Sequence, residues 1–381
     1  MEDLQSLRAQ IDQIDRQIAQ LFCQRMAVTR QVGEYKAAHG LPVLDVAREK
    51  QVLAAKAALV GDELRADITT LFETIMALSR RQQQALVMDN GWIEGHRAAW
   101  AACRVPPAHP RVLYQGEPGA YAEEAAVRFF GPDCRRTHTA TWEDIFAALR
   151  DGQADYGVLP IENSSTGSIN QVYDLLAQYG AYIVGEQVIR VDHCLMAPRG
   201  ASLDSVQLVC SHEQGLFQCE DYLKAHPDWQ RRAMLNTAAA AKWVADKGEI
   251  SLAAIGSRHA AELYGLTVLA EGINSNQENF TRFVVVSPLP ELREGRNKIS
   301  AMFTLAHESG TLHRVMTVFA TGGLNLMKLE SRPIPGRSWE YRFFADFTGD
   351  LAAYGMDSIL REMSQCAATL RILGNYKSDE S

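Results

Sequence analysis

The sequence predicts a multidomain chain with an all-helical unit, then a two-lobed α/β unit, then a small βαββαβ unit. Three observations predict this order. Apolar residues recur every three or four positions near the N-terminus, strand-like and helix-like segments alternate after residue 111, and a shorter mixed pattern follows Pro288 and Pro290. A length of 381 residues suits two or three domains, each with its own core.

Composition narrows the class of protein. A hydrophobic share of 47% and a charged share of 22% are typical of a soluble globular protein, and a net charge of −8 argues against a nucleic-acid partner. The seven cysteines show neither CxxC nor metal-ligand spacing, so we expect no disulfide framework, no metal and no other cofactor. The N-terminus is not a signal peptide and no apolar run approaches 18 residues, so we expect a cytoplasmic protein without a membrane partner.

The first unit, residues 1–88, is predicted to be helical. Its apolar seam predicts one helix of about 35 residues, roughly 50 Å long. The seam consists of Leu4, Leu7, Ile11, Ile14, Ile18, Leu21, Arg25, Val28, Val32 and Tyr35. Gly40 and Pro42 end this helix, a shorter one follows from Asp45, and a third runs from Asp62 to about Leu86. Helices this long cannot bury their seams within one small unit, so we expect an intertwined dimer.

A linker, residues 89–110, is marked by prolines and precedes the α/β unit, residues 111–290. Strands are predicted at 111–115, 155–161, 182–191, 206–210, 250–255 and 282–287. Helices are predicted at 120–130, 142–150, 168–178, 214–225 and 238–246. This alternation favours two α/β lobes with a cleft between them.

The third unit, residues 298–376, has a simpler pattern. It is predicted as a strand (299–306), a helix (310–321), two strands (324–331 and 339–348), a helix (356–369) and a strand (370–376). This βαββαβ order is that of ferredoxin-like domains.

The segment Asn279-Phe280-Thr281-Arg282-Phe283 is the first candidate site. It runs into an apolar β-branched triplet that is typical of a buried strand. Arg282 keeps its charge and needs an anion near a core, while Thr281 offers a positioned proton, so the pair suggests a site for a small carboxylic acid. The alternative is that Arg282 points to solvent and that Thr281 only favours β structure.

A polar loop, 162–168, follows the strand-like segment 157–161 and is expected to open a helix. Small hydroxyl residues and free N–H groups at a helix start can bind an anion, whereas the simpler alternative is helix capping by Ser168. The turn at 116–121 lacks the GxGxxG spacing and therefore does not predict dinucleotide binding.

The helical unit places charges where a core is expected. Arg25 lies in the apolar seam, and Lys36 lies on the same face roughly 16 Å further on. In the third helix, Ser79 and Gln83 extend an apolar stripe with polar groups. A coiled-coil dimer in which Arg25 pairs with a glutamate would also explain these positions.

Over nearly all of residues 4–86 the unit resembles the all-helical chorismate mutase family. The matching positions are Arg8, Arg25, Lys36, Asp45, Arg48, Glu49, Ser79 and Gln83. The resemblance implies that Arg8 of a second chain and Arg25 bind the two carboxylates of chorismate. Lys36 and Gln83 would donate to the ether oxygen, Glu49 would accept the ring hydroxyl, and the other residues would complete the pocket. The rearrangement is pericyclic, so positioning and charge stabilisation suffice.

Residues 111–288 resemble prephenate dehydratase. The motifs are residues 115–121, 160–167, 192–195, 211–214, 237–240 and 279–283, although Ala120 and Ala122 replace serines of some members. The resemblance implies that Thr281 donates a proton or hydrogen bond to the departing hydroxyl of prephenate. It implies a substrate pocket formed by Glu162, Asn163, Ser164, Ser211, Gln214, Thr237, Arg282 and Phe283.

The last unit resembles an ACT regulatory domain, through Gly310-Thr311-Leu312 and Glu330-Ser331-Arg332-Pro333. The resemblance implies binding of L-phenylalanine and feedback inhibition, while a dimerisation module without a ligand is the alternative. Taken together, the chain resembles bifunctional enzymes of phenylalanine biosynthesis that form homodimers or larger assemblies. A phenylalanine-binding regulatory protein without turnover, and a preference for arogenate over prephenate, are the competing interpretations.

Overall fold

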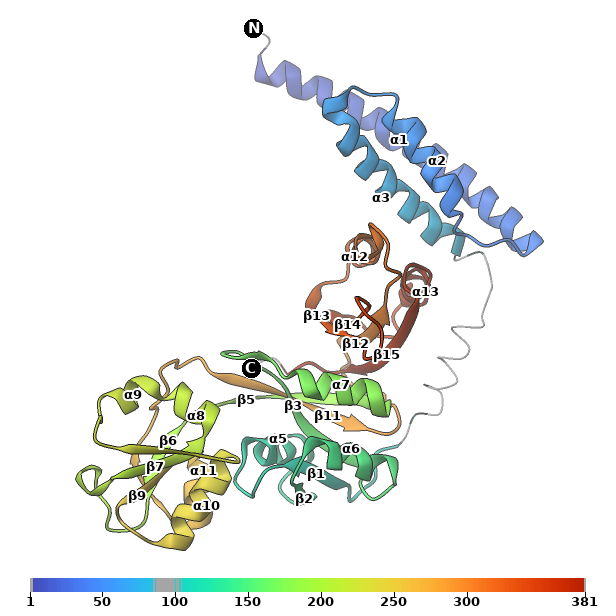
Figure 1. Cartoon of the computed structure of the whole chain (residues 1–381). Coiled ribbons are helices and arrows are strands. Elements are labelled where there is room, and N and C mark those ends of the chain that lie inside the picture. Colours follow the sequence, from blue (N-terminus) through green and yellow to red (C-terminus); the bar gives the residue numbers. More distant parts are fainter. Residues whose placement is uncertain (1–2, 85, 87–99, 101–102, 104, 380–381) are drawn as a thin grey trace.

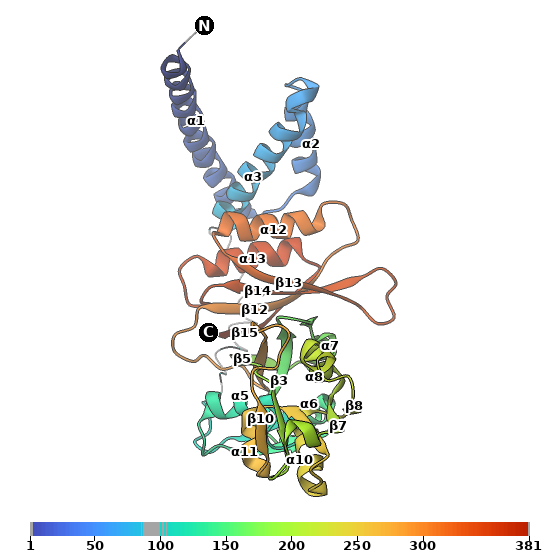
Figure 2. The same ribbon diagram turned by 90° about the vertical axis from the view of Figure 1, so that its left-hand side faces the viewer.

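The computed structural model describes residues 3–84, 86, 100, 103 and 105–379, so most of the predicted linker lies outside the described residues. Two views at right angles place the C-terminal domain between the helical unit and the α/β unit (Figures 1 and 2). In the described part of the chain, no helix has both the length and the apolar character needed to cross a membrane.

The helical unit has the elements that its sequence predicts. They are α1 (Leu4–His39), α2 (Val46–Ala57), the short 3₁₀ helix η1 (Asp62–Leu64) and α3 (Arg65–Gln84). Gly40 ends α1 in the left-handed conformation, with φ 63°, and the Asp45 side chain caps α2. Every aliphatic or aromatic seam residue of α1 is at least 42% exposed in the single chain. The seam therefore has no covering partner within the described residues of one chain.

The first α/β lobe is built on a sheet with strand order β2-β1-β3-β11-β5, to which β4 adds at β3. The strands are β1 (Arg111–Gln115), β2 (Arg135–Thr139), β3 (Tyr156–Asn163), β4 (Gly167–Ser168), β5 (Tyr182–Arg190) and β11 (Phe280–Ser287). The helices are α5 (Tyr121–Phe130), α6 (Trp142–Arg150) and α7 (Asn170–Tyr179). β11 returns from the second lobe and runs antiparallel between β3 and β5.

The second lobe has a five-stranded sheet, in the order β10-β6-β9-β7-β8. Its strands are β6 (Cys194–Ala197), β7 (Leu208–His212), β8 (Gln230–Met234), β9 (Leu252–Gly256) and β10 (Thr267–Ala270). Its helices are η2 (Leu203–Ser205), α8 (Glu213–Gln218), α9 (Glu220–Lys224), α10 (Thr237–Lys247) and α11 (Arg258–Tyr264). The chain passes between the lobes at 191–193 and 271–279, which places both connections at the cleft.

The sequence did not predict β2, β4, β6, β8, β10 or α11. β2 and β8 are edge strands rich in arginine and largely exposed, so they lack the apolar alternation that marks a half-buried strand. The polar loop after β3 was also predicted incorrectly, because it forms a β-hairpin with β4. Helix α7 begins later, after Ile169, and Ser168 does not cap it.

The C-terminal domain has the predicted βαββαβ order and the sheet order β13-β14-β12-β15. Its elements are β12 (Lys298–Thr304), α12 (Thr311–Gly322), β13 (Leu326–Pro333), β14 (Tyr341–Thr348), α13 (Met356–Cys366) and β15 (Thr369–Tyr376). The two helices lie on the side of the sheet that faces the helical unit (Figure 2). From the opposite side, Phe344, Leu373 and Tyr376 join the apolar core of the first lobe, so the two units share one core.

Gly374 marks a close approach of these two units. A Cβ at this position would overlap the backbone carbonyl of Ile183 on β5, which cannot move as a side chain could. We expect Gly374→Ala to destabilise the chain by about 1–3 kcal/mol, because the added atom forces the two backbones apart. The midpoint of thermal unfolding measures this loss.

The control is Gly61→Ala, at a residue with φ −65° and no atom within 4 Å of the added Cβ. This variant should unfold at nearly the wild-type temperature. Equal stability of the two variants would mean that the shared core tolerates separation of the backbones.

Candidate functional site

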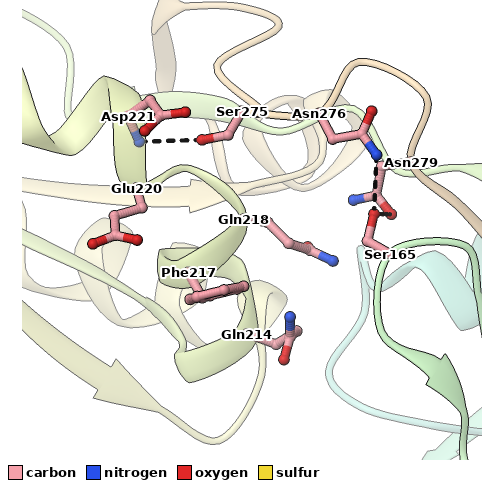
Figure 3. Close-up of a pocket in the computed structure, with 9 residues that line it drawn as sticks. All are labelled: Ser165, Gln214, Phe217, Gln218, Glu220, Asp221, Ser275, Asn276 and Asn279. Atoms are coloured by element: carbon pink, nitrogen blue, oxygen red, sulfur yellow. Dashed lines mark hydrogen bonds between the residues drawn. The ribbon is translucent and has the colours of Figure 1, made fainter.

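A cavity of about 180 Å³ lies in the cleft between the α/β lobes (Figure 3). One wall comes from α8 and α9 of the second lobe, and the other comes from the β3–β4 turn and the connection that leads into β11. Its lining residues are Ser165, Gln214, Phe217, Gln218, Glu220, Asp221, Ser275, Asn276 and Asn279. Amides, hydroxyls, one aromatic ring and the carboxylates of Glu220 and Asp221 therefore surround a space suited to a small polar ring compound.

Asn163 organises the first-lobe wall of this cavity. Its Oδ1 accepts hydrogen bonds from the backbone N–H groups of Ser165 and Thr166, at 3.0 and 3.1 Å. This fixes which end of the amide is oxygen, and Nδ2 consequently donates to Thr281 Oγ1 at 2.9 Å and to Asn279 Oδ1 at 2.8 Å. The Thr281 hydroxyl accepts this bond, which leaves its own proton available for donation.

Asn279 carries a second available donor. The residue is 1% exposed, and its Oδ1 accepts a hydrogen bond from Asn163 Nδ2. Its Nδ2 is buried and has no hydrogen-bond partner among the residues that the structure describes. A buried amide donor without a partner is costly, so an acceptor on a bound molecule would satisfy it.

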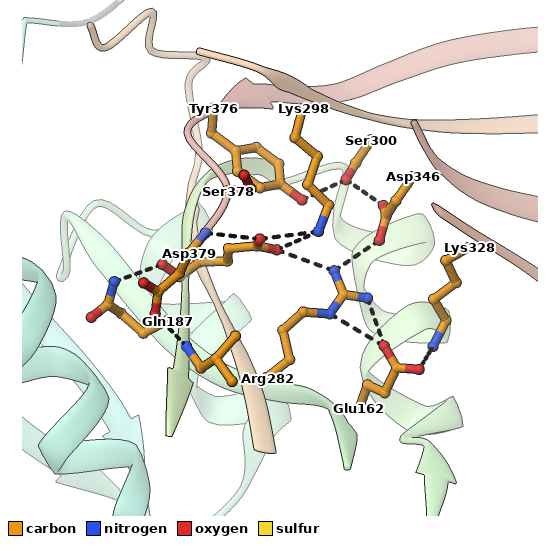
Figure 4. Close-up of polar contacts among 12 residues, drawn as sticks. Glu162, Gln187, Arg282, Lys298, Ser300, Lys328, Asp346, Tyr376, Ser378 and Asp379 are labelled. Carbon is orange, nitrogen blue, oxygen red and sulfur yellow. Dashed lines mark hydrogen bonds and ion pairs between the residues drawn. The ribbon is translucent and has the colours of Figure 1, made fainter. Parts of the chain in front are cut away.

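Arg282 lies on the opposite face of β11 from Thr281, because side chains alternate along a strand. Its guanidinium contacts three carboxylates: Asp346 at 2.8 Å, Glu162 at 3.0 Å and Glu186 at 3.2 Å. The sequence predicted that Arg282 and Glu162 belong to the substrate pocket. The structure instead directs both side chains toward the C-terminal domain (Figure 4). Glu162 directly precedes Asn163 on β3 and Arg282 directly follows Thr281 on β11, so their side chains point to the opposite face of the sheet.

Two lysines of the C-terminal domain complete this charged cluster. Lys298 contacts Glu186 at 2.8 Å, and Lys328 contacts Glu162 at 2.8 Å. Burial alone would raise the pKa of Glu162, but Lys328 and Arg282 outweigh it and lower that pKa. The same balance holds for Asp346. Burial would raise its pKa, but the charges of Arg282 and Lys298 outweigh burial, so the pKa of Asp346 is lowered. The carboxylates therefore stay ionised, and the cluster joins the two units by charge.

The remaining predicted prephenate residues occupy different places. Gln214 lines the cavity, and the Ser164 hydroxyl donates to the Glu278 carbonyl at 3.1 Å, which ties the lobe connection to the β3–β4 turn. Ser211 is fully buried and donates to the Ile255 carbonyl at 2.8 Å, while Thr237 begins α10. Phe283 is buried in the core beneath α5. Ser211 and Phe283 thus support the lobes from within.

His193 lies at the connection between the lobes. Burial lowers the pKa of His193, opposed by its hydrogen bond to Gln218, so the ring is neutral near pH 7. It lies 3.2 Å from the Tyr121 hydroxyl and 3.0 Å from Gln218 Oε1, and so connects both lobes. This geometry agrees with a structural role for the histidine.

The helical unit gathers most of the predicted chorismate residues between its three helices. Arg25 donates to the Ser79 hydroxyl, and burial lowers the pKa of Arg25. Lys36 donates to the Val43 carbonyl at 2.6 Å. Gln83 is 8% exposed, and its Oε1 has no hydrogen-bond partner among the described residues.

The other predicted residues of this pocket differ in their exposure. Asp45 caps α2 by accepting from the Arg48 N–H at 2.9 Å, and the Arg48 side chain is exposed. Glu49 contacts Arg80 at 2.5 Å, a partner that the sequence did not single out. Arg8 is exposed and lies about 25 Å from Arg25 along α1, too far to share one pocket in one chain.

The predicted effector residues of the C-terminal domain divide into two groups. Thr311 and Leu312 follow Gly310, the N-cap of α12, and line a second cavity of about 350 Å³. The segment 330–333 lies on β13, where Glu330 and Arg332 contact the first α/β lobe and Ser331 is exposed.

The contacts of β13 reach the β3–β4 turn directly. Glu330 accepts a hydrogen bond from the Ser168 hydroxyl at 2.5 Å, and Lys328 donates to the same hydroxyl at 2.8 Å. Arg332 forms an ion pair with Asp174 on α7 at 2.7 Å. The predicted effector motif is thus in contact with the hairpin that carries Asn163.

The described residues contain no group of three or more His, Cys, Asp and Glu side chains placed to hold a metal ion. The candidate sites combine amides, hydroxyls, guanidinium and ammonium groups with carboxylates such as those of Glu49 and Glu330.

Comparison with known proteins agrees with two enzyme units. A family model described as chorismate mutase type II matches residues 7–84, and one described as prephenate dehydratase matches residues 112–290. The bifunctional chorismate mutase/prephenate dehydratase of Escherichia coli (strain K12) is 33% identical over 390 residues, which cover 99% of this chain and 96% of that protein.

Two solved structures match the part of the chain that follows the helical unit. One is described as GqqA, a novel type of quorum quenching acylase, with 29% identity and a TM-score of 0.65 over 71% of this chain and 98% of that one. The other is the prephenate dehydratase of Arthrobacter aurescens in complex with L-Phe, with 27% identity and a TM-score of 0.64 over 70% of this chain and 90% of that one. By its match to the Escherichia coli enzyme along nearly its whole length, the chain belongs to the family of bifunctional chorismate mutase/prephenate dehydratases and has both enzyme activities.

Proposed function

We propose that the cleft of the α/β unit converts prephenate to phenylpyruvate, with Thr281 as the donor to the departing hydroxyl. The observation that carries this proposal is the bond from Asn163 to Thr281, which leaves the threonine proton free. Asn279 Nδ2 and Gln214 are the additional donors for the substrate. We do not assign this role to Arg282, because its guanidinium already contacts three carboxylates.

The reaction needs little covalent chemistry from the protein. The bond to the leaving carboxylate breaks and its electron pair enters the ring. The ring C–O bond then breaks, and the hydroxyl leaves as water with one added proton. Aromatisation drives the step, so a fixed hydrogen-bond donor at the hydroxyl and a rigid pocket supply the catalysis. A threonine hydroxyl is a weak acid, which favours hydrogen-bond donation over complete proton transfer by Thr281.

In the helical unit we propose that Arg25, Lys36, Glu49, Ser79 and Gln83 bind chorismate, with Arg48 and Asp45 at the edge of the pocket. The desolvated Arg25 and the unpartnered Oε1 of Gln83 support this proposal, since both groups gain from a bound molecule. Lys36 and the Gln83 amide donate to the ether oxygen, where negative charge develops as the bond breaks. The match to the Escherichia coli enzyme along nearly the whole chain favours an enzyme over a regulatory protein that has lost its activities.

The two activities should be separable by single substitutions. We expect Thr281→Ala to lower dehydratase kcat about 10²–10⁴-fold and to leave mutase kcat intact, because only the cleft loses its donor. We expect Lys36→Ala to do the reverse, with a loss of about 10²–10³-fold in mutase kcat. Chorismate consumption and phenylpyruvate formation, assayed separately on purified full-length protein, measure both effects.

The matched control for the cleft is Thr281→Ser, which keeps the hydroxyl and should keep dehydratase kcat within about tenfold of wild type. Equal loss of both activities from either alanine variant would contradict the assignment of separate sites.

We propose that the chain is a homodimer in which α1 of one copy covers α1 of the other. The exposed apolar seam supports this arrangement, as does the separation of Arg8 from Arg25, which lets Arg8 serve the pocket of a partner chain. Such an arrangement is isologous, so each dimer has two shared pockets.

Subunit mixing tests the shared pockets. Arg8→Ala and Arg25→Ala variants should each lose mutase activity, because each lacks one cation in every pocket. An equimolar mixture that has exchanged subunits should regain roughly a quarter of wild-type mutase activity, since half of the dimers then carry one intact pocket of two. No recovery, despite exchange shown by differently tagged chains, would place Arg8 outside the partner's pocket.

We propose that L-phenylalanine binds the C-terminal domain and inhibits the dehydratase. The contacts of Glu330 and Lys328 with Ser168 support this proposal, because they link the effector motif to the hairpin that carries Asn163. The donors and the left-handed Gly310 at the start of α12 suit the carboxylate of an amino acid.

Inhibition should depend on the effector motif. We expect Glu330→Ala and Ser331→Ala to raise the concentration of L-phenylalanine that halves dehydratase activity about tenfold or more, because coupling between sites is typically of this size. Arg150→Ala, which removes an exposed ion pair with Asp151 in the first α/β lobe, is the control and should be inhibited like wild type. Unchanged inhibition in both motif variants would move the effector site elsewhere.

A further inference from the structure

The C-terminal domain also contacts the helical unit, through the end of α3. Arg81 donates to the carbonyl of Thr321 at 2.5 Å and to its hydroxyl at 2.6 Å, at the C-terminal end of α12. A cation at this end of a helix is favoured by the free carbonyl groups. Both views show the end of α3 beside α12 and α13 (Figures 1 and 2).

Glu362 on α13 is the unusual residue of this contact. It is 0% exposed, yet neither carboxylate oxygen has a hydrogen-bond partner among the described residues. Its ion-pair distances are long, at 3.6 Å to Arg81 and 3.9 Å to Arg80. Burial raises the pKa of Glu362, and the two arginines oppose that change. A buried ionic group with so few close contacts does not favour stability, so its presence calls for another explanation.

Arg80 connects Glu362 to the proposed chorismate pocket. One guanidinium nitrogen contacts Glu49 at 2.5 Å and another faces Glu362 at 3.9 Å, while the arginine side chain is only 11% exposed. The positive charges of Arg80 and Arg81 equal in number the negative charges of Glu49 and Glu362. Because the guanidinium is rigid and planar, a change at its Glu362 end moves the nitrogen that holds Glu49.

We propose that Arg80 and Glu362 are positioning residues of the chorismate mutase, and that the C-terminal domain thereby forms part of the support of the mutase pocket. Glu362 holds Arg80, and Arg80 holds the Glu49 carboxylate where it can accept the ring hydroxyl of chorismate. This inference rests on the proposed role of Glu49 in binding chorismate. It extends that role, because it makes mutase kinetics depend on a residue of the C-terminal domain.

The test is Glu362→Gln in the full-length chain, which removes the charge and keeps the shape. We expect mutase KM to rise about fivefold, with kcat changed less than KM, since the ring hydroxyl is held in the ground state as well. Dehydratase kcat/KM, measured on the same preparation, should stay within about twofold of wild type and report that the chain is folded. Glu63→Gln removes an exposed carboxylate of the helical unit and should leave both activities unchanged.

A double-mutant comparison separates positioning from a merely structural role. Arg80→Met should reproduce the rise in mutase KM, and adding Glu362→Gln to Arg80→Met should cause no further rise, because Glu362 acts through Arg80. A wild-type mutase KM in Glu362→Gln, or an undiminished effect in the Arg80→Met background, would overturn the proposal.

Failure of the underlying pocket assignment gives a different result. If Glu49→Gln leaves mutase KM and kcat unchanged, the proposed role of Glu49 is wrong, whatever Glu362→Gln does. If Glu49→Gln impairs the mutase and Glu362→Gln does not, the pocket stands and only the link to the C-terminal domain falls.

Discussion

The alternation of side chains along β3 and β11 is the constraint on which the dehydratase depends. Thr281 lies opposite Asn163 in the antiparallel ladder, and Arg282 lies opposite Glu162. One pair faces the cleft and forms a hydrogen bond, while the other faces the C-terminal domain and forms an ion pair. The same two strands therefore carry the proposed reacting groups on one side and the contact with the C-terminal domain on the other, with no intervening element.

This arrangement makes the C-terminal domain the centre of the chain. It shares an apolar core with the first α/β lobe, and charged groups cross both of its interfaces. Buried ion pairs contribute little net stability because desolvation offsets their attraction, but they penalise any arrangement that leaves one partner alone. Charges at both interfaces thus restrict the domain to few orientations relative to the first α/β lobe and to the helical unit.

Much of this architecture could be predicted from the sequence. The seam of α1, the stop at Gly40 and the order of the last six elements follow from periodicity and turn residues, which are local signals. The edge strands β2 and β8 could not be predicted in this way, because their many arginines hide the alternation of a strand.

Candidate site residues could be proposed from the sequence, but the directions of their side chains could not be predicted. Arg282 looked like a ligand for a carboxylic acid, and it does bind carboxylates, but those of Glu162, Glu186 and Asp346. Asp346 lies 64 positions away on another domain, so nothing local indicates the pairing. Glu362 and Arg80 were missed for the same reason, since each is an ordinary helical charge until the fold buries it.

The ion pairs at the two interfaces differ in length, and this difference bears on regulation. The ion pairs between the C-terminal domain and the first lobe are 2.7–2.8 Å long, whereas Glu362 lies 3.6–3.9 Å from its arginines, and the short contacts at that second interface are the hydrogen bonds from Arg81 to Thr321. A ligand shifts an equilibrium only by its differential affinity for two states, and that free energy passes to a site in proportion to the contacts that change. Two opposite charges at a short distance lose more interaction energy when they are moved apart by a given amount than two charges that are already far apart. On the proposal that L-phenylalanine acts on the C-terminal domain, the same movement of that domain should therefore affect the dehydratase more strongly than the mutase.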